Sequence, residues 1–419
     1  MRSSPLLLAL LLTACGTSSG GASVATIDAS TSPVPDGASP QNGGDAGLPV
    51  AKDGSTTTNP DAGTPAGDAG TGVATIRVHY PTGSHKITLR GASSPYSWTT
   101  GVPLTPGASD TWTLSTPSLS APLQFKPLLD DMTWSRGPNY AAPPGATVDI
   151  YPHFTTITGA YSNAFQFTSS ILGNTRGVWV YLPPSYNENT LATFPVVYMH
   201  DGQNLFDPAA AFGGNTWQIG QTMDAAAEDG SIAEAIIVGP ENTSDRIAEY
   251  TPVTDPTTPT TDGAKGALYL QMLITELKPK IDATYRTVTD RDHTFMMGSS
   301  LGGLITAYAS VERADVYGGF GVMSPSTWWD NSWILGEVAT MPMHAVHPNR
   351  VYLDSGNAGA SNDDVTQTAQ LDAQYQSVGF VQGSTLDYLV QNGGQHSEIY
   401  WAQRAPGALA FLVGPRAYR

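Results

Sequence analysis

A serine at position 300 stands in a pattern that suits a nucleophile. Gly298-Ser299-Ser300-Leu301-Gly302 matches G-x-S-x-G, follows the apolar run 295–297 and opens a helix-forming stretch. A strand, a sharp turn and a helix are what a nucleophile elbow requires, and side chains in place of the flanking glycines would collide there. The same pattern occurs by chance at 16–20, in a Gly/Ser-rich segment without strand or helix. Context therefore predicts Ser300 as the nucleophile, the alternative being an idle serine in a glycine-rich turn.

A serine hydroxyl needs a base, and the expected chain order is serine, acid, histidine. Of the eight histidines only His344, His347 and His396 follow Ser300. The first two precede the strand expected at 350–353, which leaves no room for an acid on a loop before them. His396 lies on a loop between a late strand and the last helix, where a triad base belongs. The sequence therefore predicts His396 as the base.

The acid of such a triad should lie on the loop after the strand that ends at Leu353. Asp354, Asp363 and Asp364 all satisfy the order. Asp354 is expected still on the strand end, so we favour Asp363 or Asp364, between which the sequence does not decide. Either could instead be the N-cap of the helix that follows, as aspartates often are.

An acyl-transfer site also needs two backbone N–H groups that stabilise the oxyanion. One is expected from Leu301, directly after the nucleophile. The other is expected from the loop after the third strand, His200-Asp201-Gly202-Gln203-Asn204.

Apolar runs and helical patterns alternate from about residue 157 to the end. This alternation predicts an α/β fold with a mostly parallel central sheet and helices on both faces, as in an α/β-hydrolase. The expected strands are 177–182, 194–199, 235–238, 294–297, 318–322, 350–353 and 386–390. The expected helices are 267–281, 301–309, 365–378 and 404–412.

Residues 74–156 form a different region, with about five short strands and no helical pattern between them. We interpret this region as a small all-β sandwich, similar to immunoglobulin-like or carbohydrate-binding modules. Its aromatic residues could stack on sugars, or they belong to the core and fasten loops, which is the commoner role. These residues are Trp98, Trp112, Trp134 and Tyr140.

The N-terminal segment predicts export. Residues 1–15 combine Arg2, a short apolar run and Leu12-Thr13-Ala14-Cys15, which resembles a bacterial lipobox. Cys15 is the single cysteine, so we expect it to be lipidated, with an ordinary signal peptide as the alternative. By resemblance to proteobacterial lipoproteins, Gly16 instead of an aspartate after Cys15 favours the outer membrane or cell surface. Residues 16–73 are rich in Gly, Ser, Pro and Asp and predict a disordered tether.

Composition limits the partners. The net charge of −17 argues against nucleic acid or an anionic membrane surface. We expect no metal or cofactor, because clusters of His or Cys ligands are absent from the sequence. A monomer is expected.

Four motifs in order resemble the putative esterase family, which includes enterochelin esterases, S-formylglutathione hydrolases, feruloyl esterases and mycolyltransferases. The motifs are Val197–Phe206, Met297–Gly303, Ser324–Asp330 and Gly393–Glu398 followed by Trp401. The resemblance implies that Gln203 supplies the second oxyanion N–H and that Trp328 and Trp329 flank the acyl pocket. It also implies that the loop of Arg246, Glu249 and Tyr250 orders the site, which makes Arg246 and Asp201 candidate substrate-binding residues.

These observations predict a serine carboxylic ester hydrolase that works through an acyl-enzyme. The expected substrate is an extracytoplasmic ester, either an acylated polysaccharide, suggested by the β module, or a siderophore, suggested by the Arg246 region. Two alternatives stay open: an acyltransferase of the mycolyltransferase type, and a non-catalytic surface-binding protein on a hydrolase scaffold.

Overall fold

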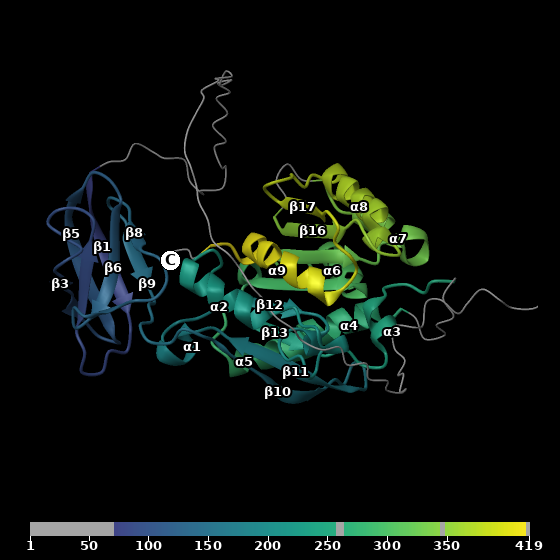
Figure 1. Cartoon of the computed structure of the whole chain (residues 1–419), viewed down its shortest axis with the longest axis horizontal. Coiled ribbons are helices and arrows are strands. Elements are labelled where there is room, and N and C mark those ends of the chain that lie inside the picture. The colour runs from purple at the N-terminus through teal and green to yellow at the C-terminus, as the bar shows by residue number, and fades with distance from the viewer. Residues whose placement is uncertain (1–70, 257–263, 344–347, 416–419) are drawn as a thin grey trace, which may run out of the picture. The chain divides into compact units, whose positions relative to one another are not determined.

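A computed structural model describes residues 71–256, 264–343 and 348–415 (Figure 1). The predicted signal peptide, Cys15 and residues 16–70 of the predicted tether lie outside this range, as do His344 and His347. Within the described residues, no helix combines the length and apolar character needed to cross a membrane.

The first folded region contains two small sheets around one hydrophobic core. One sheet has the order β4-β5-β1-β9, and the other has β3-β2-β6-β7 with β8 paired to β6. Alternating side chains of β1 and β2 point into the core, for example Ile76, Val78 and Leu89. This is the all-β module expected from the sequence, although β1 begins at Gly72, two residues before the predicted start. The strands are β1 (Gly72–His79), β2 (Ile87–Gly91), β3 (Val102–Pro103), β4 (Thr105–Pro106), β5 (Thr111–Leu119), β6 (Leu123–Leu129), β7 (Thr133–Trp134), β8 (Tyr140–Ala142) and β9 (Thr147–Ile150).

The four aromatic residues of this module that were considered for sugar stacking divide into two pairs. Tyr140 is buried and Trp112 packs partly buried against the core, so neither offers a free ring face. Trp98 and Trp134 are 38% and 37% exposed, with ring centroids 6.2 Å apart. The guanidinium of Arg90 lies 5.1 Å from the Trp134 ring and donates to the carbonyl of Trp98.

The second region is built on an eight-stranded sheet of order β10-β11-β13-β12-β14-β15-β16-β17. The pairs of β11 with β10 and with β13 are antiparallel, and the remaining pairs are parallel. The strands are β10 (Ala160–Thr168), β11 (Thr175–Leu182), β12 (Val196–Met199), β13 (Ile236–Pro240), β14 (Thr294–Ser300), β15 (Gly319–Pro325), β16 (Arg350–Gly356) and β17 (Leu386–Gln391).

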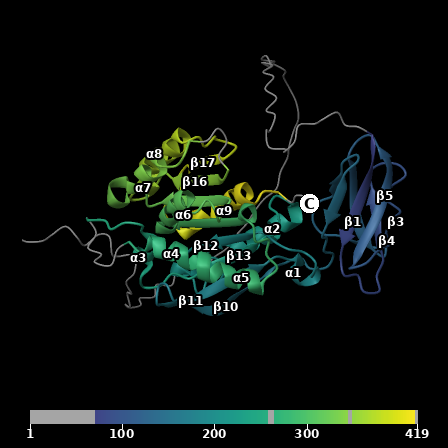
Figure 2. The ribbon, with the colours of Figure 1, turned by 180° about the vertical axis from the view of Figure 1, so that it is seen from behind.

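Helices cover both faces of this sheet (Figures 1 and 2). One hydrophobic core lies under α4, α6, α7 and α8, and a second lies under α2 and α9. The sheet and its two helical layers confirm the α/β-hydrolase fold class. The helices are α1 (Ser185–Glu188), α2 (Ile219–Asp229), α3 (Arg246–Tyr250), α4 (Gly266–Met272), α5 (Lys278–Thr284), α6 (Leu301–Glu312), α7 (Trp329–Ala339), α8 (Val365–Ser377) and α9 (Glu398–Val413), with a π-helical turn at Leu273–Leu277 between α4 and α5.

Candidate active site

Ser300 is the last residue of β14, a central strand, and α6 begins at the next residue. Its backbone has φ 59° and ψ −123°, a conformation that costs energy for a residue with a side chain. Ser300 is nevertheless partly exposed while the rest of β14 is buried. A strained serine between a central strand and a helix is the geometry of a nucleophile elbow.

The glycines of the elbow are required by close packing. A Cβ on Gly298 would lie 2.6 Å from Cδ2 of His200 and 2.9 Å from the backbone of Gly302. Gly302 has more room, since its Cβ would meet His200 at 3.3 Å. The loop after β12 therefore fits tightly against the elbow.

His396 and Asp363 contact each other directly. Nδ1 of His396 lies 2.6 Å from Oδ1 of Asp363. His396 is on the loop between β17 and α9, and Asp363 is in a short 3-10 turn, Asn362–Asp364, after β16. Burial alone would raise the pKa of Asp363, but hydrogen bonds from His396, Ser324 and Gly356 hold that pKa below its ordinary value. A buried carboxylate in its charged form thus faces the imidazole.

The other two candidate acids have different partners. The Asp364 carboxylate is hydrogen-bonded to the Trp328 side chain, and burial raises its pKa. Asp354 is fully buried, accepts from the backbone N–H of Ser324 and lies 3.0 Å from Nε of Arg404. Burial raises the pKa of Asp354 to about 6. Of the two aspartates between which the sequence does not decide, the structure places Asp363 in hydrogen-bond contact with the imidazole of His396.

The end of β15 connects the two halves of the site. The N–H of Ser326 donates to the carbonyl of Ser300 at 2.9 Å, and the two hydroxyl oxygens are 3.4 Å apart. Two residues earlier, the hydroxyl of Ser324 is 2.7 Å from Oδ2 of Asp363. From the sequence, only the two tryptophans of this Ser324–Asp330 motif are candidate site residues. The signal that could have revealed the serines is their position directly after an apolar strand next to β14.

The two expected oxyanion donors lie on adjacent backbone segments. Leu301 is the first residue of α6. Gln203 lies in a 3-10 turn, Gly202–Asn204, after β12. Met199 and Met297 are paired in the sheet, and the N–H of His200 donates to the carbonyl of Met297. The side chain of Gln203 accepts from the N–H of Asn242 at 3.2 Å, which fixes this turn.

Asp201 and Arg246 bind each other rather than standing free for a ligand. Nε and Nη2 of Arg246 lie 2.8 and 2.9 Å from the two carboxylate oxygens of Asp201, which is 5% exposed. Asn242 also donates to Asp201, and the Tyr250 hydroxyl accepts from its backbone N–H. Both carboxylate oxygens of Asp201 thus have partners within the protein, and its substrate-binding role stays a prediction. Asp201 itself has φ 57°, so this ion pair holds a strained turn next to the elbow.

Glu249 supports the same loop from inside the protein. It forms a fully buried ion pair with Arg176, whose Nη2 lies 2.8 and 2.9 Å from the two carboxylate oxygens. This ion pair anchors α3 in the protein interior, and the role of α3 in ordering the site stays a prediction.

The two tryptophans expected at the acyl pocket differ in exposure. Trp329 is 3% exposed, and its Nε1 donates to the carbonyl of Val253. Trp329 is therefore a core residue rather than a wall of an open pocket. Trp328 is 36% exposed, so part of its side chain is accessible to a ligand.

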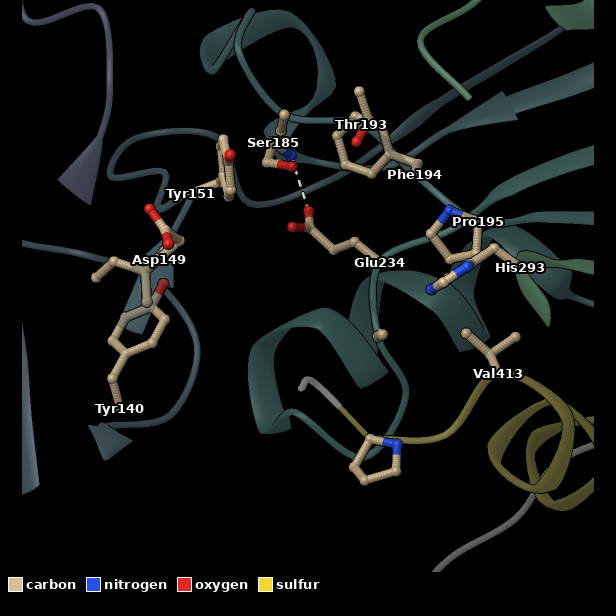
Figure 3. A pocket seen from close by; sticks show the side chains of 14 residues that line it. Tyr140, Asp149, Tyr151, Ser185, Thr193, Phe194, Pro195, Glu234, His293 and Val413 are labelled. Atoms are coloured by element: carbon tan, nitrogen blue, oxygen red, sulfur yellow. Dashed lines mark hydrogen bonds between the residues drawn. The ribbon is translucent and has the colours of Figure 1, made fainter. Parts of the chain in front are cut away.

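A cavity of about 200 Å³ lies away from this constellation (Figure 3). Its lining includes Tyr151, His293 and Glu234, which accepts from the N–H of Ser185 at 2.9 Å. Ser300, Asp363 and His396 are not among its lining residues. In the described part of the chain, no three His, Cys, Asp or Glu side chains are arranged to hold a metal ion.

Part of this chain matches a known protein family, and parts of it are similar to known proteins. Residues 169–412 match the family described as "Putative esterase". The uncharacterized protein YbbA of Bacillus subtilis (strain 168) is 28% identical over 257 residues, which are 58% of this chain and 94% of YbbA. An endo-1,4-beta-xylanase/feruloyl esterase of Xylanibacter ruminicola is 25% identical over 193 residues, or 44% of this chain, and the match spans only 24% of that relative. The crystal structure of the enterobactin esterase FES from Shigella flexneri has a TM-score of 0.48 at 16% identity and covers 81% of this chain and 92% of FES. Because the family match extends over more than half of the sequence, this chain belongs to the putative esterase family of α/β-hydrolases.

Proposed function

We propose that this protein is a serine carboxylic ester hydrolase that acts through an acyl-enzyme. The observation that carries the proposal is the strained Ser300 at the end of β14 together with the His396–Asp363 pair on the loops after neighbouring strands. A buried ionised carboxylate orients the imidazole and stabilises the imidazolium that forms when the imidazole accepts a proton. Nothing in an idle glycine-rich turn would require either feature.

The reaction follows from these roles. His396 accepts the proton of Ser300 as the hydroxyl oxygen attacks the ester carbonyl carbon. The N–H groups of Leu301 and Gln203 stabilise the oxyanion of the tetrahedral intermediate. The intermediate collapses as His396 returns the proton to the leaving alcohol. Water, deprotonated by His396, then attacks the acyl carbon of the acyl-enzyme, and the carboxylic acid is released as His396 returns the proton to the oxygen of Ser300.

The charges around the site favour a neutral ester. Both nearby arginines are already paired with carboxylates, Arg246 with Asp201 and Arg404 with Asp354. Glu398 adds a partly buried carboxylate beside Asn204. An anionic siderophore complex would meet net negative charge here, so of the two expected substrates we propose an acylated polysaccharide. The printed name of the Xylanibacter relative and the exposed pair Trp98 and Trp134 support the same choice.

The test uses the full chain and p-nitrophenyl acyl esters of increasing length, with acetylated and feruloylated xylan as polymeric substrates. Wild type should hydrolyse at least one of them, and Ser300→Ala should lower kcat by about 10⁴-fold or more. Ser310→Ala removes another buried serine hydroxyl, which lies on α6 and is bonded to Tyr375 of α8, and should leave activity unchanged. If wild type turns over no ester faster than Ser300→Ala, the proposal is wrong.

The same experiment distinguishes acyl transfer from hydrolysis. A sugar alcohol added as acceptor should leave the free acid as the main product. Predominant formation of a new ester would instead support a transferase of the mycolyltransferase type.

We propose that the protein is exported and anchored in the outer membrane through lipidated Cys15. The support is the lipobox-like Leu12–Cys15 and the absence of any second cysteine from the sequence. Metabolic labelling with an alkyne fatty acid should mark wild type and not Cys15→Ser. Equal labelling of both would contradict the anchor.

A further inference from the structure

Ser324 is a buried serine at the end of β15 that sequence reasoning did not consider. It has no exposed surface, and its backbone has φ 35°. A positive φ at a buried residue with a side chain is strained and persists only where surrounding contacts enforce it. Ser324 is therefore held in place by specific interactions.

Its hydroxyl group makes three hydrogen bonds. The oxygen lies 3.0 Å from Nε1 of Trp401 and 2.6 Å from Nη2 of Arg404, both of which can only donate. It lies 2.7 Å from Oδ2 of Asp363, which in its charged form can only accept. A hydroxyl has two acceptor sites and one proton. With both acceptor sites occupied, the proton of Ser324 must point at Asp363.

This proton fixes how the carboxylate of Asp363 is oriented. Oδ2 accepts from Ser324 and from the backbone N–H of Gly356, which lies 2.5 Å away, and Nη2 of Arg404 donates to it at 3.5 Å. Oδ1 is then left to face Nδ1 of His396. If Oδ2 lost a donor, the carboxylate could rotate and share its oxygens differently between the remaining partners.

The partners of Ser324 are themselves anchored. Arg404 is 3% exposed and forms an ion pair with Asp354, whose other oxygen accepts from the backbone N–H of Ser324. The arrangement is a closed ring of Ser324, Arg404 and Asp354 beneath the triad acid. Such a ring of buried polar and charged groups resists movement, because each group would lose a partner if it moved.

We propose that Ser324 is a positioning residue for ester hydrolysis, and that it orients the carboxylate of Asp363 so that Oδ1 faces His396. The proposal rests on the esterase function proposed above. Trp401 and Arg404 take part in the same positioning, because they occupy both acceptor sites of the Ser324 hydroxyl and leave it to donate to Asp363. The effect of Ser324 should thus appear only through Asp363.

A double-mutant cycle tests this dependence. Ser324→Ala should lower kcat by about 10- to 100-fold, the loss expected when a hydrogen bond to a charged group is removed, with KM changed little. In an Asp363→Asn background, where orientation of the acid no longer matters, Ser324→Ala should cause at most about a 2-fold further loss. Ser310→Ala serves as the matched control for removal of a buried hydroxyl.

Each outcome decides the question. An equal loss from Ser324→Ala in both backgrounds, or no loss in either, overturns the positioning role while wild-type esterase activity stands. An inactive wild type overturns the proposed function instead. Titration of reactive sites with a fluorophosphonate normalises kcat to folded protein. If Ser324→Ala does not fold, Ser324→Gly removes the same hydroxyl and tolerates the positive φ.

Discussion

His396 and Asp363 are 33 residues apart in the sequence, and their side chains meet with 2.6 Å between Nδ1 and Oδ1. The Asp363 side chain has no exposed surface, whereas that of His396 is 32% exposed. The base is therefore accessible to a substrate while its acid is protected from solvent. This asymmetry suits a pair in which the acid only orients and stabilises.

Asp363→Asn should remove that stabilisation. An amide cannot supply the negative charge that balances an imidazolium, so we expect kcat to fall by about 10³- to 10⁴-fold. Steady-state kinetics on a p-nitrophenyl ester measure the effect. Asp364→Asn is the matched control, one residue away, and should retain kcat within about 5-fold since its carboxylate is bonded to Trp328. If Asp364→Asn lowered kcat strongly and Asp363→Asn did not, the loop that carries the two aspartates would have to rearrange in solution.

Gly202→Ala should disrupt the oxyanion turn. A Cβ on Gly202 would lie 2.0 Å from the backbone carbonyl oxygen of Gly239, which cannot yield without moving β13. We expect a loss of about 2–4 kcal/mol in the free energy of unfolding, measured by urea denaturation. Gly336→Ala in α7 meets no atom within 4 Å and should be neutral or stabilising by up to about 1 kcal/mol. Equal stability of the two variants would contradict the tight packing around Gly202.

His200 should make the protein sensitive to mild acid. Its ring is fully buried and Nδ1 lies 2.9 Å from the Tyr269 hydroxyl. Burial lowers the pKa of His200 from 6.5 to about 4, so the unfolded chain takes up a proton more readily than the folded one. The stabilisation that neutral His200 gives to the folded state is fully present above pH 6.5, and it is lost as the pH falls toward 4.

His200→Gln removes this titration. The variant should be less stable than wild type near neutral pH, and the difference should shrink by about 2 kcal/mol between about pH 7.5 and about pH 5. Urea unfolding at the two pH values gives both differences. A difference that does not change with pH would show that His200 titrates alike in both states.

Arg246→Ala should act on catalysis through the turn that carries Gln203. Without the guanidinium, the buried carboxylate of Asp201 loses both of its charged hydrogen bonds. We expect kcat to fall by about 10- to 100-fold, corresponding to about 1–3 kcal/mol of lost support. Lys265→Ala removes a cation from an exposed ion pair with Asp245 and should change kcat little. Similar values of kcat for Arg246→Ala and Lys265→Ala would contradict a role of Arg246 in supporting the turn that carries Gln203.

Strongly apolar elements of the sheet could be predicted from sequence, and weakly patterned ones could not. All four side chains of β12 are buried, and this continuous apolar run predicts a central strand. In β10, by contrast, only Phe167 is buried, because it is an edge strand. The helix α3 has only five residues, which is too short to show a helical period. The helix α2 does show one in its buried Ile219, Met223 and Ala226, although it is not among the predicted helices.

The choice of acid depends on three consecutive backbone angles. Asn362, Asp363 and Asp364 have φ values of 53°, 48° and 52°. This run rotates Asp363 inward and leaves Asp364 beside Trp328. No propensity predicts three left-handed residues in succession, so the sequence left both aspartates open. Ser300 and His396 could be proposed as nucleophile and base because glycines, strand ends and chain order carry that information locally.

The ring beneath Asp363 also affects when the site can form during synthesis. Trp401 and Arg404 reach Ser324 from 77 and 80 residues further along the chain. Contacts this distant form only after the intervening chain has been made and has folded back. Ser300 thus leaves the ribosome long before α9 can dock and complete its surroundings. A nascent chain would carry its nucleophile in an unassembled site, and hydrolytic activity would begin only with the docking of α9.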